Sequence, residues 1–279
     1  MLKCKLGRLC LQGFISPKSE THPFAPGPCS TYNHLVDRET IEKLLALNRE
    51  FYAAFAQPFA DSRSLSDPAL TSILPHIPQG ARVLDVGCGN GRLARLLDRE
   101  LPGAIYVGID AVPELIEVAR AQAAELETIT SQFHVADITQ PDWSLAIDSL
   151  FIDVIVCLAV LHHIPSFDLR TRILREMAGL LAPGGIVILS TWQFLGSDRL
   201  RRKIVDWTDV GLAEQALERG DYLLDWKRGG QGLRYCHLVD EAEVEHLAAE
   251  SGLRVQTTFR AGGREGNLSL FAVLDRKNG

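Results

Sequence analysis

A short glycine-rich segment places the strongest constraint on how this chain folds. Residues 83–91 read Val-Leu-Asp-Val-Gly-Cys-Gly-Asn-Gly, an apolar run that leads into three glycines at alternate positions. Glycine lets the backbone take positive φ and approach a bound molecule without a Cβ in the way. The segment is therefore typical of the sharp turn from a strand of a parallel sheet into a helix, with Asp85 at the carboxyl end of the strand.

The spacing of these glycines argues against two common kinds of nucleotide site. In the dinucleotide pattern G-x-G-x-x-G the third glycine comes one position later, where this chain has Arg92. The triphosphate-binding pattern G-x-x-x-x-G-K-[ST] does not occur in the sequence. An oxidoreductase that uses NAD is therefore disfavoured.

The sequence beyond the turn alternates strand-like and helix-like segments. Apolar, strand-like segments cover residues 104–109, 132–136, 151–160 and 186–190. Helical patterns lie between them, over residues 113–127 and 167–181. This alternation predicts an α/β fold with a Rossmann-like, doubly wound sheet that is mostly parallel. Two last strand-like segments, 253–260 and 268–276, have only a glycine-rich turn between them and predict a C-terminal antiparallel hairpin.

Two further acids follow strands of this predicted sheet. Asp110 comes 25 residues after Asp85, and Asp137 ends the next strand. An acid about ~20 residues past such a turn can accept hydrogen bonds from ribose hydroxyls. The carboxyl ends of parallel strands meet at one edge of the sheet, so we expect both acids to lie near the glycine turn.

Together these features resemble the class I S-adenosylmethionine-dependent methyltransferases, whose D-x-G-x-G-x-G motif matches Asp85, Gly87, Gly89 and Gly91. The resemblance implies S-adenosylmethionine as the cofactor. It also implies that the Asp137 carboxylate and the Ile138 main-chain N–H meet the adenine. The predicted cofactor-binding residues are Tyr52, Arg63, Asp85, Gly87, Cys88, Gly89, Asn90, Gly91, Asp110, Ala111, Asp137, Ile138 and Leu158.

Over about residues 48–275 the chain also resembles the eukaryotic tRNA wobble-uridine carboxymethyl methyltransferases. The matching segments are Phe51-Tyr52 to Ser62-Arg63, Ala159-Val-Leu-His-His163, Gly220-Asp to Trp226, and Arg234-Tyr-Cys-His237. The resemblance implies a tRNA substrate with a carboxylate acceptor, and an activating partner protein. We take Trp192, Arg234 and His237 as the candidate substrate-binding residues. The family usually has a second aromatic residue where Cys236 stands, and the loop after His163 is longer here. Both departures leave the substrate open.

The chemistry of the acceptor decides what the site needs beyond the cofactor. A carboxylate acceptor is ionised at neutral pH and needs cations or N–H donors, which His162, His163, Arg234 and His237 can supply. A hydroxyl or amine acceptor needs a base, and imidazole titrates near neutral pH, so His163 is the candidate. We therefore take His163 and His162 as the candidate catalytic residues.

The chain, with 279 residues of which 46% are hydrophobic, can bury one large core with additions. We expect a poorly ordered tail over residues 1–37, which contains several prolines, and one methyltransferase domain over residues 38–279. Within it, residues 38–63 are predicted as an amphipathic cap helix that covers the sheet edge or acts as a lid. Residues 192–239 form an insert too long for a simple connection, predicted to lie on the substrate side.

The net charge of −6 has the wrong sign for a broad electrostatic surface that binds phosphates. Contacts to RNA must therefore be local. The candidate basic runs are Arg199, Arg201, Arg202 and Lys203, then Lys227 and Arg228. A small-molecule O- or N-methyltransferase, and a non-catalytic scaffold that binds RNA or protein, stay open as alternatives.

The six cysteines contain no C-x-x-C pair, which is typical of reduced thiols in the cytoplasm and not of a metal site or a disulfide framework. No stretch approaches the ~18 consecutive apolar residues that cross a bilayer. We therefore expect a cytoplasmic protein without a metal and without a membrane partner.

Overall fold

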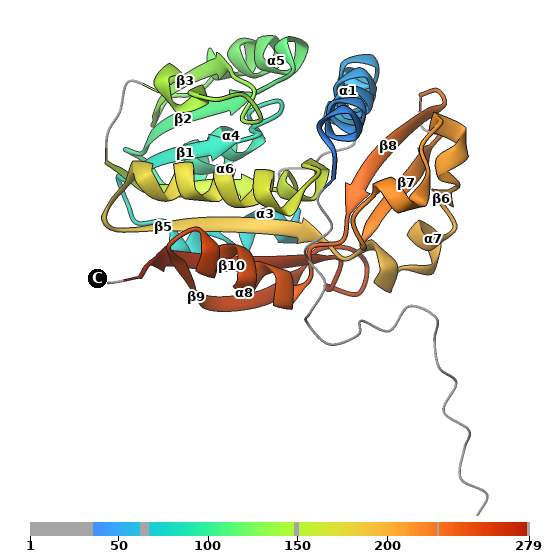
Figure 1. Ribbon diagram of the computed structural model, residues 1–279. Coiled ribbons are helices and arrows are strands. Elements are labelled where there is room, and N and C mark those ends of the chain that lie inside the picture. Colours follow the sequence, from blue (N-terminus) through green and yellow to red (C-terminus); the bar gives the residue numbers. More distant parts are fainter. Residues whose placement is uncertain (1–35, 62–66, 148–150, 228, 278–279) are drawn as a thin grey trace, which may run out of the picture. The chain divides into compact units, whose positions relative to one another are not determined.

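The computed structural model describes residues 36–61, 67–147, 151–227 and 229–277 (Figure 1). The predicted tail lies outside the described residues except for Val36 and Asp37, and Arg63 lies outside them too. The boundaries of the tail and of the domain therefore stay predictions.

The core is one seven-stranded sheet with the order β3-β2-β1-β4-β5-β10-β9. Its strands are β1 (Arg82–Val86), β2 (Ile105–Asp110), β3 (Thr130–Val135), β4 (Ile152–Leu158), β5 (Leu181–Trp192), β9 (Leu253–Ala261) and β10 (Ser269–Arg276). The first five pair in parallel, whereas β10 pairs antiparallel with both β5 and β9. The predicted Rossmann-like sheet with its C-terminal hairpin is confirmed.

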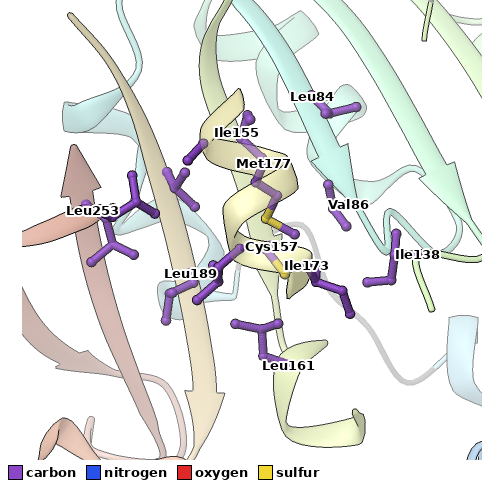
Figure 2. Close-up of a cluster of buried hydrophobic side chains, with 14 of the residues drawn as sticks. Leu84, Val86, Ile138, Ile155, Cys157, Leu161, Ile173, Met177, Leu189 and Leu253 are labelled. Atoms are coloured by element: carbon purple, nitrogen blue, oxygen red, sulfur yellow. The ribbon is translucent and has the colours of Figure 1, made fainter. Parts of the chain in front are cut away.

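Helices cover both faces of this sheet. The side chains of α6 (Phe167–Leu180) and α8 (Glu241–Glu250) form one buried cluster with Leu84, Ile155 and Leu189 (Figure 2). On the opposite face lie α3 (Pro68–Thr71), α4 (Arg92–Glu100) and α5 (Pro113–Ala123), which pack with Val83, Val156 and neighbouring residues. Because β4 is covered on both sides, its sequence is nearly all apolar instead of alternating.

The predicted cap helix is two helices, α1 (Arg38–Ala54) and α2 (Ala56–Asp61). Asp37 caps the start of α1, where its side chain accepts a hydrogen bond from the Thr40 N–H. The break follows from Pro58, which has no N–H to donate to Ala54, four residues earlier. The helix predicted over residues 113–127 is likewise shorter and ends at Ala123.

The insert contains a second sheet that the sequence did not predict. Its strands β6 (Ile204–Val205), β7 (Asp221–Trp226) and β8 (Gly232–His237) pair antiparallel in that order, and the short helix α7 (Asp198–Arg201) precedes them. Helix α1 lies beside β8 (Figure 1). Among the described residues, no helix has both the length and the apolar character that a membrane span requires.

Candidate active site

The glycine turn after β1 is built on residues with positive φ. Gly87 has a φ of +75°, and a Cβ there would lie 2.3 Å from Val160 Cγ2. Gly91 precedes α4, and a Cβ there would lie 3.0 Å from the ring of Phe133, so this glycine lets the helix pack close to the sheet. A Cβ on Gly89 would meet nothing within 4 Å. Gly89 therefore leaves its backbone open to a bound molecule.

Asp110 holds the end of β2 against this turn. The Gly89 N–H donates to Asp110 Oδ2 over 2.9 Å, and the Val112 N–H donates to Oδ1, also over 2.9 Å. Burial raises the pKa of the Asp110 carboxyl, and the main-chain hydrogen bonds oppose this rise. The Asp110 carboxylate thus fixes the conformation of the glycine turn, which would contact a bound cofactor.

Asp85 is 5% exposed and accepts a hydrogen bond from the Tyr106 O–H, with an oxygen–oxygen distance of 2.6 Å. Burial raises the pKa of Asp85 to about 7. The Tyr106 hydrogen bond opposes this, the charge of Asp110 adds to it, and Arg92 lowers it. The carboxyl therefore changes its charge near neutral pH.

Asp85→Asn is expected to remove a pH dependence of folding stability. The folded carboxyl has a pKa of about 7 and an unfolded aspartate one of ~3.9, so the folded protein binds the extra proton between these values. The free energy of unfolding therefore falls as the pH rises through this window. Between pH ~5 and ~7 we expect the wild type to lose about 2 kcal/mol relative to Asp85→Asn, measured by urea unfolding. Parallel pH dependences of the two proteins would contradict this.

A pocket lies between the turn, the strand ends and α1. Of the thirteen predicted cofactor-binding residues, eleven line it: Tyr52, Asp85, Gly87, Cys88, Gly89, Asn90, Asp110, Ala111, Asp137, Ile138 and Leu158. Gly91 serves helix packing instead, and Arg63 lies outside the described residues. The contacts of these residues to a cofactor stay a prediction.

Helix α1 contributes pocket residues that the sequence analysis missed. Leu45, Asn48 and Arg49 line the pocket together with Tyr52. Their helical spacing marks a shared face, but nothing in the sequence says what that face covers. The Arg49 Nη1 lies 3.3 Å from Asp137 Oδ2, so an ion pair joins α1 to the loop after β3.

The two candidate catalytic histidines lie in different surroundings. His163 lines the pocket, with Nε2 2.7 Å from the Tyr52 hydroxyl and Nδ1 2.9 Å from the Tyr235 carbonyl oxygen. His162 is fully buried, does not line the pocket, and stacks on Trp192 with ring centroids 5.6 Å apart. His163 is therefore the one placed to meet an acceptor.

Arg234 and Trp192 contact each other, but they lie beside the pocket and not among its lining residues. Arg234 is 2% exposed, and its guanidinium carbon lies 4.5 Å from the ring centre of Trp192, 5.3 Å from that of Trp226 and 5.4 Å from that of Phe51. These contacts form an aromatic cage around a cation.

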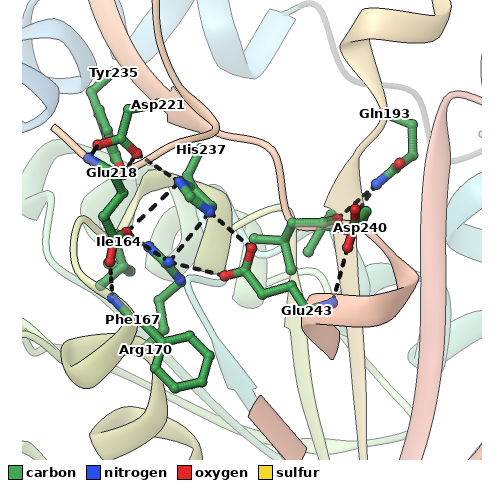
Figure 3. Close-up of polar contacts among 12 residues, drawn as sticks. Ile164, Phe167, Arg170, Gln193, Glu218, Asp221, Tyr235, His237, Asp240 and Glu243 are labelled. Carbon is green, nitrogen blue, oxygen red and sulfur yellow. Dashed lines mark hydrogen bonds and ion pairs between the residues drawn. The ribbon is translucent and has the colours of Figure 1, made fainter. Parts of the chain in front are cut away.

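His237 does not take the substrate position predicted for it. It is buried, with Nδ1 2.6 Å from Asp221 and Nε2 2.8 Å from Glu243 (Figure 3). Burial and the charge of Arg170 lower the pKa of His237, but the two carboxylates outweigh them and raise it to about 9. Both ring nitrogens of His237 are bound by acids, so in this structure the side chain stabilises the insert.

The same network fixes the insert to the core. Arg170 of α6 is fully buried and lies 2.8 Å from Glu218 and 2.9 Å from Glu243. Glu218, Asp221 and His237 also lie close enough to share a metal ion, but the Arg170 cation in contact with them opposes a second cation there. The network connects the insert to α6 and α8.

Residues 55–258 match a family model described as a methyltransferase domain. The chain belongs to this family. The resemblance to class I methyltransferases drawn from the glycine turn is thereby confirmed, and the cofactor of that class, S-adenosylmethionine, is the one predicted from the sequence.

Among curated relatives, a tRNA (carboxymethyluridine(34)-5-O)-methyltransferase of Arabidopsis thaliana is 29% identical over 141 residues, 50% of this chain and 31% of the relative. A ubiquinone biosynthesis O-methyltransferase of Xanthomonas campestris is 33% identical over 167 residues, 60% of this chain and 65% of the relative. The chain thus spans less than two thirds of the length of either relative.

Solved structures share the fold. An S-adenosylmethionine-dependent methyltransferase of Methanosarcina mazei has a TM-score of 0.56 and 23% identity, covering 74% of this chain and 96% of its own. A complex of the Haloferax volcanii Trm112 methyltransferase activator with a methyltransferase has a TM-score of 0.55 and 18% identity, covering 82% and 96%. At these identities the likeness concerns the fold.

Proposed function

We propose that the pocket binds S-adenosylmethionine and that the protein transfers the methyl group to an oxygen atom of an acceptor. The observation that carries this proposal is one pocket lined by the glycine turn, by two strand-end acids and by the His163–Tyr52 pair. The names of both kinds of curated relative specify transfer to oxygen.

The residues present fit this cofactor. Gly89 leaves open space for close approach, and the Asp110 carboxylate can accept from ribose hydroxyls. Asp137 and Ile138, which follow β3, would hold the adenine. When bound, S-adenosylmethionine supplies a methyl group that is already activated. The protein has to orient the acceptor in line with that group and exclude water.

A tRNA acceptor that carries a carboxylate is one candidate, supported by a basic surface on the insert. The main-chain N–H of Asp225 donates to the Lys203 carbonyl over 2.8 Å, which brings Lys203 close to the end of β7, next to Lys227. Lys203 Nζ lies 5.7 Å from the ring centre of Trp226, near Arg199 and Lys227. Cations next to a half-buried aromatic ring suit single-stranded nucleic acid.

A hydroxyl acceptor on a small molecule is the second candidate, supported by the charges of the pocket itself. A carboxylate acceptor needs a cation close to it. Among the residues that the structure describes, two arginines line the pocket and both are engaged by acids, Arg49 by Asp137 and Arg92 by Asp67. The polar pair at the pocket is instead His163 with Tyr52, which suits proton removal.

Labelled S-adenosylmethionine, incubated with bulk tRNA and separately with a small-metabolite extract, separates the two candidates. Mild alkali then releases the label from a methyl ester but leaves a methyl ether intact.

Titration calorimetry with S-adenosylhomocysteine tests the cofactor itself, with Asp110→Ala as the control expected to bind weakly. No binding at high micromolar concentration would overturn the proposed function.

The predicted activating partner also stays a proposal, supported by the likeness to the methyltransferase in the Trm112 complex. Full methyl transfer by the purified chain would contradict it.

A non-catalytic scaffold predicts that Asp110→Ala keeps partner binding and that no acceptor takes the label. We also propose a cytoplasmic location, because the cysteine pattern is typical of reduced thiols.

A further inference from the structure

We infer that Tyr52 and His163 form a proton relay that takes the proton of a hydroxyl acceptor, so Tyr52 is a catalytic residue as well as part of the pocket wall. The inference rests on the proposed function, since it concerns the acceptor end of the same pocket. It also chooses between the two acceptors, because a relay of this kind serves an acceptor atom that carries a proton.

The hydrogen bonds of His163 fix which ring nitrogen carries the proton. Nδ1 lies 2.9 Å from the Tyr235 carbonyl oxygen, which can only accept a hydrogen bond. Nδ1 is therefore the protonated nitrogen, and Nε2 of the neutral ring presents its lone pair. Nε2 lies 2.7 Å from the Tyr52 hydroxyl, which donates to it. The base of the pair thus lies at Nε2, next to the pocket.

The same tautomer argues against a metal at this place. His162, His163 and Cys236 lie close enough together to share an ion, and Cys236 Sγ is 3.6 Å from His163 Nδ1. Nδ1 cannot be a ligand while it donates to Tyr235. Burial raises the pKa of the Cys236 thiol to about 12, so the sulfur also keeps its proton.

The carbonyl that sets this tautomer is itself held in place. The Tyr235 N–H donates to Asn48 Oδ1 over 2.8 Å, and Asn48 Nδ2 donates to the carbonyls of Tyr235 and His163, each over 3.2 Å. The Tyr235 hydroxyl donates to the buried Asp221 over 2.8 Å. Asn48 and Tyr235 are therefore positioning residues, which orient the imidazole through the Tyr235 carbonyl.

The transfer balances with these two side chains. The acceptor oxygen forms a bond to the methyl carbon while the sulfur–carbon bond breaks and its electron pair stays on sulfur. The acceptor proton passes to the Tyr52 oxygen as the Tyr52 proton passes to His163 Nε2. The imidazolium later returns this proton to solvent. A carboxylate carries no proton at neutral pH, so methyl transfer to a carboxylate would not use the relay.

The tautomer is tested by long-range ¹H–¹⁵N spectra of the histidine rings, with S-adenosylhomocysteine added, at a pH where the ring is neutral. We expect His163, assigned from the signal that His163→Asn removes, to carry its proton on Nδ1. Tyr52→Phe should move the Nε2 resonance downfield because a donor is withdrawn, whereas Tyr222→Phe, in the insert, should leave it unchanged. A proton on Nε2, or no response to Tyr52→Phe, overturns the relay.

Methyl transfer to the tRNA and metabolite pools provides the kinetic test. His163→Asn keeps an N–H at the place of Nδ1 and removes the base, so we expect a fall in kcat of about 100-fold or more and the loss of the acidic limb of the pH profile. Tyr52→Phe should lower kcat about 10-fold or more. His163→Asn should bind S-adenosylhomocysteine within about 2-fold of the wild type.

The outcomes separate this inference from the proposed function. Wild-type turnover in His163→Asn, or a product ester that alkali cleaves, overturns the relay and leaves the methyltransferase intact. Loss of S-adenosylhomocysteine binding in the wild type overturns the proposed function, while the ring spectra without ligand still decide the tautomer. Asn48→Asp, which cannot donate to the Tyr235 carbonyl, should lower kcat while KM stays the same.

Discussion

Gly87→Ala is expected to lower the free energy of unfolding by about 2–5 kcal/mol. The left-handed φ of +75° costs an alanine roughly 1–2 kcal/mol. The new Cβ would lie 2.3 Å from Val160 Cγ2, and forcing atoms into a packed place adds about 1–3 kcal/mol. Val160 belongs to the loop after β4, so the strain falls on the wall that also carries His163. Urea unfolding followed by circular dichroism measures the change.

Gly89→Ala is the matched control, since Gly89 has a similar φ of +56° but nothing within 4 Å of the added Cβ. Its destabilisation should be confined to the backbone cost of about 1–2 kcal/mol. Its effect on S-adenosylhomocysteine affinity should be larger than that on stability, because the methyl group would occupy open space in the pocket. Equal destabilisation by both alanines would show that the contact of the new Cβ with Val160 does not contribute to the loss of stability.

Asp110→Ala is expected to weaken S-adenosylhomocysteine binding by about 100-fold or more. The carboxylate accepts from the main-chain N–H groups of Gly89 and Val112, and in the proposed complex it accepts from the ribose as well. Hydrogen bonds to a charged group contribute about 1.5–3 kcal/mol each, and a 100-fold change in affinity corresponds to about 2.7 kcal/mol. Titration calorimetry measures the affinity directly.

Two variants show whether this loss is specific. Asp110→Asn keeps one oxygen acceptor and should lose about 10-fold. Asp275→Ala removes an acid of an exposed ion pair with Arg254, distant from the pocket in the sheet, and should bind like the wild type. An affinity for Asp110→Ala within 3-fold of wild type would contradict the proposal that Asp110 binds the cofactor.

The parts of the fold that could be predicted are those that depend on residues close together in the sequence. Each of these patterns spans only a few residues: the glycine turn after β1, the apolar run of β4, and the acids at the end of β2 and after β3. Because parallel strands end at one edge of the sheet, these local patterns also bring the predicted cofactor residues into one pocket.

The missed features depend on contacts between distant residues. Asn48 binds Tyr235 across 187 residues, and Tyr52 binds His163 across 111. No spacing rule relates such positions. His237 was predicted at the substrate for its residue type, but the acids that hold it come from the start of β7 and from α8. The break between α1 and α2, by contrast, has a local cause in Pro58.

The hydrogen bonds between Asn48 and the main chain of Tyr235 have a consequence for how the protein is made. During synthesis, β1 to β4 and the acids beside them leave the ribosome long before residues 232–237, so the emerging chain lacks the support of α1 and of the imidazole. A nascent chain halted before β8 should therefore capture cofactor weakly and transfer no methyl groups.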